Sequence, residues 1–319
     1  VQEKAYKSGS MNKADWRQVL KKLPLNSHIT LTGGEPLLVK GFAEIVANIR
    51  ESMTFNVITN GLMLNEQIIN MLLQHPSFRV LSISIDGFEN ISRDFSKEQW
   101  CSLVEKIKLF NIIKTKYNVK RKVKAILDIK SVVLSSNVHD IGKMAHMSQD
   151  LQADTHIFMF LKGSPMQHSD EIFEYSQIHS RADNPPEYNV NAVIDELKIL
   201  QNTIINKKDC KTRYFLHPKL VDLYDSNDDL NVLHSLLDQK HHEPSKFETC
   251  FAPWESMHIN NDGNAFPCLA FETGNVRTQS LEEICKSSNY INFKEKILEC
   301  GTLPACKQCG YLLPKASYK

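Results

Sequence analysis

Several features that this sequence lacks exclude whole classes of protein. The 319 residues contain no apolar run near the roughly 18 residues that a spanning helix needs, so we expect no membrane segment. Lysine plus arginine (38) and aspartate plus glutamate (37) nearly cancel, which argues against a dedicated nucleic-acid binder. We find no export signal, paired catalytic carboxylates, nucleophile elbow or phosphate-binding loop. Apolar residues nevertheless make up 42% of the chain, enough for one large core or two ordinary ones.

Cysteine is scarce in most of the chain and frequent near its end. Only Cys101 and Cys210 precede residue 250, and both are interpreted as free thiols. In a chain without an export signal, clustered thiols favour a metal site in a reducing cytoplasm over a disulfide framework. Six cysteines lie in the last seventy residues, namely Cys250, Cys268, Cys285, Cys300, Cys306 and Cys309.

Four of these cysteines form two spaced pairs. Cys250 is followed by twelve residues, Gly263, four residues and Cys268, and Cys306 and Cys309 form a Cys-x2-Cys pair. Residues 257–267 are typical of two short strands around an Asn-Asp-Gly turn, which would bring the first pair together. Four thiolates in this pattern can hold tetrahedral zinc or an iron–sulfur cluster. Cys285, in a predicted helix, is interpreted as packing, whereas Cys300 stays a possible fifth ligand.

The first 170 residues show a different pattern, in which β-branched runs alternate with amphipathic helical segments. This alternation predicts βα units and a parallel sheet. Ligands bind such sheets outside the carboxyl ends of the strands. Polar or glycine-rich turns fall at those ends, at residues 33–36, 59–61, 84–87 and 135–137. The predicted strands are residues 29–32, 55–59, 80–85, 123–134 and 155–160.

Two motifs resemble those of one enzyme family. Gly33-Gly34-Glu35-Pro36 after an apolar strand resembles the GGEP motif of radical S-adenosylmethionine (SAM) enzymes. The Cys-x12-Gly-x4-Cys spacing resembles their SPASM/Twitch auxiliary-cluster domain. The resemblance implies an α/β fold: a partial (β/α)6 radical SAM barrel that lacks its first strand in this chain, plus a small C-terminal cysteine-rich cluster domain.

The resemblance also implies which residues bind cofactors. Gly33, Gly34 and Glu35 would lie against the amino group of SAM, with Asn60 at the end of the next strand. Ser84 and Asp86 would approach the ribose, and Arg93 would face the SAM carboxylate. An ordinary turn at Asp86 and a solvated surface charge at Arg93 are the alternatives. One auxiliary [4Fe–4S] cluster, as in Twitch domains, would be held by Cys250, Cys268, Cys306 and Cys309.

One expected motif is missing. Radical SAM enzymes hold their SAM-reducing [4Fe–4S] cluster with Cys-x3-Cys-x2-Cys, but no cysteine here precedes Cys101. The sequence begins with Val1 rather than Met, and the first barrel strand is absent as well. We therefore expect these cluster ligands upstream of Val1. The alternative is a SAM-fold protein that has lost its chemistry.

These patterns divide the chain into three expected parts. Residues 1–165 would form the partial barrel, and residues 248–319 the SPASM/Twitch-like domain. The stretch 166–247 contains a Pro185-Pro186 break followed by a helical face, so a helical linker or substrate-contacting insert is expected.

By resemblance, the implied function is hydrogen abstraction by a 5′-deoxyadenosyl radical, followed by oxidation or cross-linking of the substrate. A peptide or protein side chain is slightly preferred as substrate over a small molecule. The alternatives are a dehydrogenase or epimerase of a sugar or aminocyclitol, an inactive binding protein, and a zinc-ribbon module on an α/β barrel. An electron donor such as a flavodoxin or ferredoxin is the expected partner. The catalytic residues stay unassigned.

Overall fold

The computed structural model of the chain describes most residues between Gly9 and Lys315. The gaps between described segments are residues 88–94, 161–188, 206–209, 218–220, 224–229, 231, 238–242, 269–270, 304–305, 307–308 and 310. The described residues fall into two compact units. The barrel unit contains the described residues of 24–161 and 187–233, and the cysteine unit contains those of 1–23 and 234–319.

The barrel unit is built on a seven-stranded sheet in the order β1-β2-β3-β4-β5-β6-β7. The first six strands pair in parallel and β7 pairs antiparallel to β6. This confirms the predicted α/β class with a parallel sheet. The strands are β1 (His28–Leu31), β2 (Thr54–Thr59), β3 (Phe78–Ser84), β4 (Ile126–Val133), β5 (Thr155–Phe160), β6 (Arg213–His217) and β7 (Val221–Asp222).

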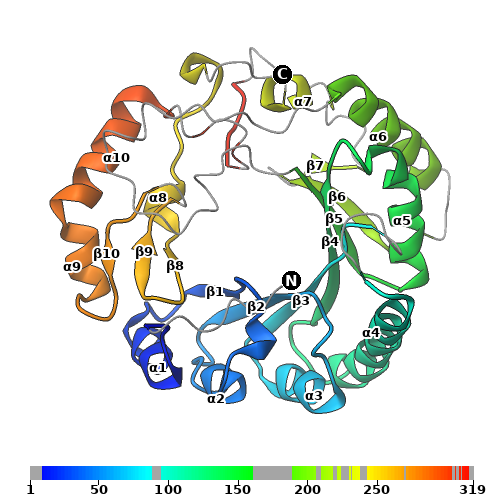
Figure 1. Cartoon of the computed structure of the whole chain (residues 1–319), viewed down its shortest axis with the longest axis horizontal. Coiled ribbons are helices and arrows are strands. Elements are labelled where there is room, and N and C mark those ends of the chain that lie inside the picture. The colour runs from blue at the N-terminus through cyan, green and yellow to red at the C-terminus, as the bar shows by residue number, and fades with distance from the viewer. Residues whose placement is uncertain are drawn as a thin grey trace. The chain divides into compact units, whose positions relative to one another are not determined.

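Helices connect the parallel strands and lie along the outer side of the curved sheet in Figure 1. The connecting elements are η1 (Pro36–Leu38), α2 (Phe42–Ala47), α3 (Glu66–Gln74), α4 (Lys97–Asn118), η2 (Val138–Asp140), α5 (Ile141–Asp150) and α6 (Val190–Ile205). Two of these helices begin with a polar cap: before α3, Asn65 accepts from the Ile68 N–H at 2.9 Å, and before α4, Ser96 forms a capping box with Gln99.

The two faces of this sheet differ in polarity. A Cβ built on Gly61 would lie 2.6 Å from Leu103 of α4 and 3.4 Å from Ile83, so Ile83 points toward the helices. The strand period of two then directs Ser82 and Ser84 to the opposite, inner face. The outer face is largely apolar and buried under the helices. The inner face, by contrast, carries a series of polar side chains.

Two strands of the sheet, β6 and β7, lie in the stretch expected to be a linker or insert. The helix predicted within residues 166–247 is present as α6, but neither strand was predicted. In β6, Tyr214 and Leu216 are almost fully buried, while Arg213 is exposed. At five residues the strand is too short for its alternation to stand out between polar segments. The described residues of 190–222 therefore belong to the barrel unit, and β6 and β7 extend its sheet.

The cysteine unit contains a small three-stranded sheet and several short helices. The hairpin expected at residues 257–267 is confirmed, since β8 pairs antiparallel with β9 and Gly263 at the turn has φ +90°. Strand β10 extends it in the order β10-β9-β8. The elements near and within this unit are α7 (Val232–Leu237), η5 (Pro244–Lys246), α8 (Ala252–Glu255), β8 (His258–Ile259), β9 (Asn264–Phe266), β10 (Gly274–Asn275), α9 (Leu281–Lys286) and α10 (Ser288–Cys300).

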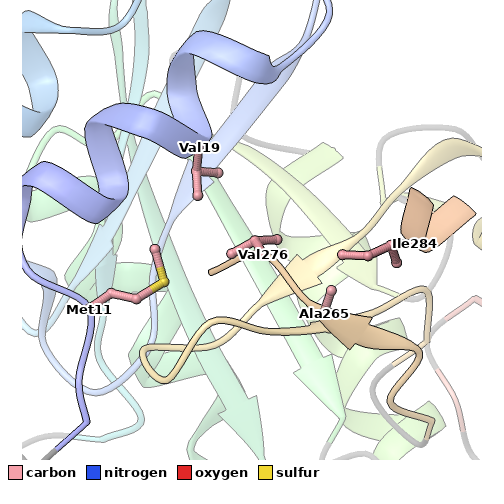
Figure 2. Packing of buried hydrophobic residues seen from close by; sticks show 5 residues of the cluster. All are labelled: Met11, Val19, Ala265, Val276 and Ile284. Carbon is pink, nitrogen blue, oxygen red and sulfur yellow. The ribbon is translucent and has the colours of Figure 1, made fainter. Parts of the chain in front are cut away.

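Helix α1 (Lys13–Lys22) belongs to the cysteine unit although it lies at the start of the sequence. Met11 and Val19 pack with buried residues of the hairpin region and of α9. The Met11 N–H donates to the Asn261 carbonyl at 2.5 Å, and Arg277 donates to the Gly9 carbonyl at 2.6 Å. Figure 2 shows the five side chains of this cluster, namely Met11, Val19, Ala265, Val276 and Ile284.

Candidate functional site

The glycine motif lies directly after β1, at the carboxyl edge of the sheet. Gly33 has φ +123°, a conformation that side chains rarely allow, whereas Gly34 lies outside this range. A Cβ built on either glycine would meet no atom within 4 Å among the described residues. The backbone here is therefore open to close approach by a ligand, which fits the space that SAM would need.

The Glu35 side chain is used to join the ends of two strands. Its carboxylate accepts from the Thr59 hydroxyl at 2.6 Å, the Asn60 N–H at 2.9 Å and the Leu37 N–H at 3.2 Å. These hydrogen bonds fix the GGEP turn against the end of β2. The carboxylate therefore positions the turn, and any contact of Glu35 with SAM would use its backbone.

The turn after β2 is fixed by its own side chains. Asn60 accepts from the Leu62 N–H at 2.9 Å, and Thr59 accepts from the Gly61 N–H at 3.0 Å. The Asn60 amide nitrogen is not among the atoms that these bonds use. Asn60 consequently stays a candidate ligand residue.

Asp86 is largely occupied by structural hydrogen bonds. Its carboxylate accepts from the Val132 N–H at 2.9 Å, and its carbonyl accepts from the buried Asn137 side chain at 2.9 Å. Asn137 also donates to the Val132 carbonyl at 2.9 Å, so it ties β3 and β4 together past their ends. These contacts support the ordinary-turn alternative for Asp86. Arg93 lies outside the described residues, and its predicted role stays a prediction.

Strand register places Ser84 beside a residue that sequence reasoning missed. Ser84 pairs with Lys130, and Thr59 pairs with Ile83, so Asn60 follows at the level of Ser84. Ser84 and Lys130 thus occupy one layer on adjacent strands, and Asn60 follows the end of β2 next to this layer. The signal for Lys130 was present in the sequence, because Asp128 and Lys130 alternate with apolar residues in a buried strand.

A polar network supports Lys130 from below. Its ammonium lies 3.1 Å from the Asp128 carboxylate, whose side chain is only 3% exposed. Asp128 also accepts from the Ser82 hydroxyl at 2.8 Å and the Thr155 hydroxyl at 2.7 Å. The lysine side chain is 20% exposed. The carboxylate is therefore well satisfied, and the ammonium above it still reaches solvent-accessible space.

The four paired cysteines gather in the cysteine unit. Cys250, Cys268 and Cys306 pack against one apolar cluster that includes Phe271 and Phe293. The Cys250 N–H donates to the Gly301 carbonyl at 3.0 Å, which ties Cys250 to the end of α10. Within the Cys306–Cys309 pair, the Cys309 N–H donates to the Cys306 carbonyl at 2.8 Å. Cys285 and Cys300, by contrast, are exposed.

The thiols also influence one another electrostatically. Burial raises the pKa of the Cys306 thiol well above its usual value, and the charges of Cys309, Cys268 and Cys250 raise it further. The Leu303 N–H donates to Cys306 Sγ at 3.3 Å and partly opposes this shift. Four mutually repelling thiolates are the donor set that a multivalent metal group stabilises. These residues therefore fit an iron–sulfur cluster chemically.

A site for a single metal ion is not preformed. Among the described residues, no three His, Cys, Asp or Glu side chains lie in a geometry that could hold one ion. Assignment of the four cysteines as cluster ligands stays a prediction. Among the described helices, none has both the length and the apolar character needed to cross a membrane.

Fold and site together define a class: an α/β barrel protein with an open glycine turn at the carboxyl edge of its sheet and a unit whose paired thiols fit an iron–sulfur cluster. Two family models match the chain, that of the radical SAM superfamily over residues 3–142 and that of the SPASM iron–sulfur cluster-binding domain over residues 250–310. The chain belongs to the radical SAM superfamily and carries a SPASM domain. SAM, a [4Fe–4S] cluster and an auxiliary iron–sulfur cluster are the cofactors of this class.

Known proteins similar to this chain include a maturation protein and two proteins of known structure. The sporulation killing factor maturation protein SkfB of Bacillus subtilis is 39% identical over 83 residues, which are 25% of this chain and 20% of SkfB. SuiB of Streptococcus suis has a similar structure, with a TM-score of 0.58 at 14% identity over 94% of this chain and 66% of SuiB. The structure of anSMEcpe with AdoMet and the Cp18Cys peptide has a TM-score of 0.55 at 16% identity, over 94% of this chain and 79% of anSMEcpe.

Low identity and partial coverage limit what can be concluded from these relatives. At such identities the two solved structures show a common fold only. The chain also matches just a fifth of SkfB and less than two thirds of SuiB.

Proposed function

We propose that this protein is a radical SAM enzyme that abstracts hydrogen from a peptide or protein side chain and oxidises or cross-links it. The observation that carries the proposal is the pairing of two centres in one chain. An open glycine turn lies at the carboxyl edge of a parallel sheet, and four neighbouring thiols lie in a SPASM domain. One centre suits SAM, and the other suits an auxiliary cluster.

The preference for a peptide substrate comes from the relatives. SkfB is described as a maturation protein of a sporulation killing factor, the structure of SuiB has been solved with the precursor peptide SuiA, and that of anSMEcpe with the Cp18Cys peptide. A dehydrogenase or epimerase of a sugar or aminocyclitol is the alternative that keeps the same cofactors.

In this proposal the residues of the sheet edge bind and orient the SAM cofactor. The backbone at Gly33 and Gly34 would accept from the amino group of SAM, because no side chain blocks the approach. Glu35 would keep this turn in place through Thr59 and Asn60. Ser84, on the inner face, would contact the ribose.

When bound, SAM and the two clusters supply the hydrogen-abstracting and electron-transfer chemistry, for which an external donor such as a flavodoxin or ferredoxin would provide electrons. The contribution of the chain is position and exclusion of water. The inner face combines a polar layer at Ser84 and Lys130 with apolar side chains such as Ile157 and Val132, and would thus hold a ligand with both polar and apolar parts.

The test is SAM binding and cleavage by the anaerobically purified, full-length protein. We expect 5′-deoxyadenosine from SAM and a chemical reductant, and loss of SAM binding by calorimetry in Gly34→Val. A Cβ at Gly34 meets no described atom, so the variant should fold and keep the iron of the cysteine unit. Gly142→Ala, in α5 and with equally open space, is the matched control.

Two results would contradict the proposal. A wild-type protein that binds SAM but forms no 5′-deoxyadenosine would support the inactive binding-protein alternative. Normal SAM binding by Gly34→Val would mean that the ligand does not lie against the glycine turn.

A further inference from the structure

The Lys130 side chain is mostly buried, forms an ion pair with Asp128 and is still partly exposed to solvent. A purely structural ion pair does not require this exposure. Its partner Asp128 is already satisfied by the hydroxyls of Ser82 and Thr155. A lysine ammonium has three N–H donors, and the ion pair with Asp128 accounts for one of them. Among the described residues, no other hydrogen-bond partner of Lys130 is found.

The position of Lys130 also connects it with the proposed cofactor site. It faces the inner side of the sheet, directly across from Ser84 in the strand register. Adjacent strands lie about 4.8 Å apart, so a lysine side chain reaches ligand atoms that lie over Ser84. Its neighbours on β5, across the same layer, are apolar, for example Ile157.

The surroundings increase the strength of any contact made by this ammonium. Only a fifth of the lysine side chain is exposed, and a charge in partly apolar surroundings is less screened than one on an open surface. A buried ion pair by itself adds little net stability, because desolvation offsets the attraction. An ammonium supported in this manner is well suited to a charge-assisted hydrogen bond with a carboxylate.

We propose that Lys130 is a binding residue for the carboxylate of SAM, and that Asp128, held by Ser82 and Thr155, positions its ammonium. The inference rests on the proposed function, since it requires SAM to lie along the inner face between the glycine turn and Ser84. It identifies an anchor within the described residues for the group that the sequence had assigned to Arg93.

The test compares SAM with decarboxylated SAM, an analogue that lacks only the carboxylate. Binding of both to the full-length protein is measured by calorimetry for the wild type, Lys130→Met and Lys130→Arg. We expect Lys130→Met to bind SAM at least about tenfold more weakly, while its affinity for decarboxylated SAM changes little. Lys130→Arg, which keeps the charge, should recover part of the loss. Lys143→Met, which removes an exposed lysine from α5, is the control.

A second measurement needs no variant and covers the case in which Lys130→Met fails to fold. Lysine acylation of the wild type, followed by peptide mass spectrometry, should show Lys130 protected by SAM and not by decarboxylated SAM. Equal protection by both compounds, or equal loss of both affinities in Lys130→Met, would overturn the assignment. Unchanged SAM affinity in that variant would also overturn it. A wild type that binds neither compound would instead contradict the proposed function itself.

Discussion

At the scale of single residues, Glu35 shows how a motif residue can act without touching the ligand. Sequence comparison groups it with Gly33 and Gly34, yet its carboxylate is occupied by Thr59, Asn60 and Leu37. The glycines leave space, while the glutamate fixes the backbone that borders this space. A single motif therefore contains two separate physical roles.

His156 is a second residue whose environment decides its chemistry. It is fully buried on the outer face of the sheet, and its Nε2 lies 2.9 Å from the Ser131 hydroxyl. Since Ser131 donates its proton to the Ile85 carbonyl, Nε2 carries the imidazole hydrogen. Nδ1 has no partner among the described residues. Protonation would therefore bury an unsatisfied cation, and burial, with a contribution from Lys130, lowers the pKa of His156 to about 3.

This shift predicts a loss of stability in acid. The unfolded chain binds a proton at His156 below the ordinary pKa of 6.5, whereas the native protein does so only near 3. Between these values the unfolded state holds more protons, so the free energy of unfolding falls as pH falls, by up to about 1.4 kcal/mol per pH unit from this group. His156→Gln should flatten the dependence in urea unfolding measured at several pH values. If the free energy of unfolding of His156→Gln fell with pH as steeply as that of the wild type, His156 would not be the cause of the acid sensitivity.

At the scale of elements, α1 belongs to a different unit from the strand that follows it. The polar cap of α1 is local, since Asn12 and Asp15 form a capping box. Its partners, however, are distant in sequence: Ala265, Val276 and Ile284 cover Met11 and Val19. The radical SAM family model includes this segment, although it packs with the SPASM region in the same unit.

We therefore predict that changes in the N-terminal segment weaken the cysteine unit. Met11→Ala removes a side chain that is only 2% exposed and should cost about 2–5 kcal/mol, as buried Met truncations do. Hydrogen exchange of residues 258–276 should accelerate, while that of β3 and β4 stays unchanged. Lys21→Ala, at an exposed position of α1, is the control. Exchange that accelerates in the barrel strands instead would place the coupling elsewhere.

At the scale of the whole molecule, the two candidate cofactor sites lie in different units. The barrel unit holds the glycine turn and the layer of Ser84 and Lys130, and the cysteine unit holds the four paired thiols. Each centre depends on residues far apart in sequence. The unit with Cys250 to Cys309 also depends on Met11, so truncation at a sequence-based boundary would remove part of its core.

The four-cysteine assignment predicts the iron content. Cys306→Ala or Cys309→Ala should lose about four irons per chain, as expected for one [4Fe–4S] cluster, and destabilise the cysteine unit. Cys285→Ala is the control and should leave the iron unchanged, because Cys285 is exposed on α9. Iron and zinc are measured after anaerobic purification. Stoichiometric zinc instead of iron would favour the zinc alternative.

The sequence by itself determined features that depend on local chemistry or on short-range periodicity. The parallel α/β class followed from alternating strands and helices, and the hairpin before Cys268 followed from its Asn-Asp-Gly turn, which the pairing of β8 with β9 confirms. Family resemblance to GGEP and to the SPASM spacing is confirmed by both family models.

Only the tertiary structure decided which distant residues meet. Strand β6 was missed because five residues between polar segments give little periodicity, and α1 gave no sign of its partners some 250 residues away. Lys130 became a candidate only when the register placed it beside Ser84. The physical reason is common to all three: strand pairing and side-chain packing join residues across long loops, and a local pattern carries no information about the partner.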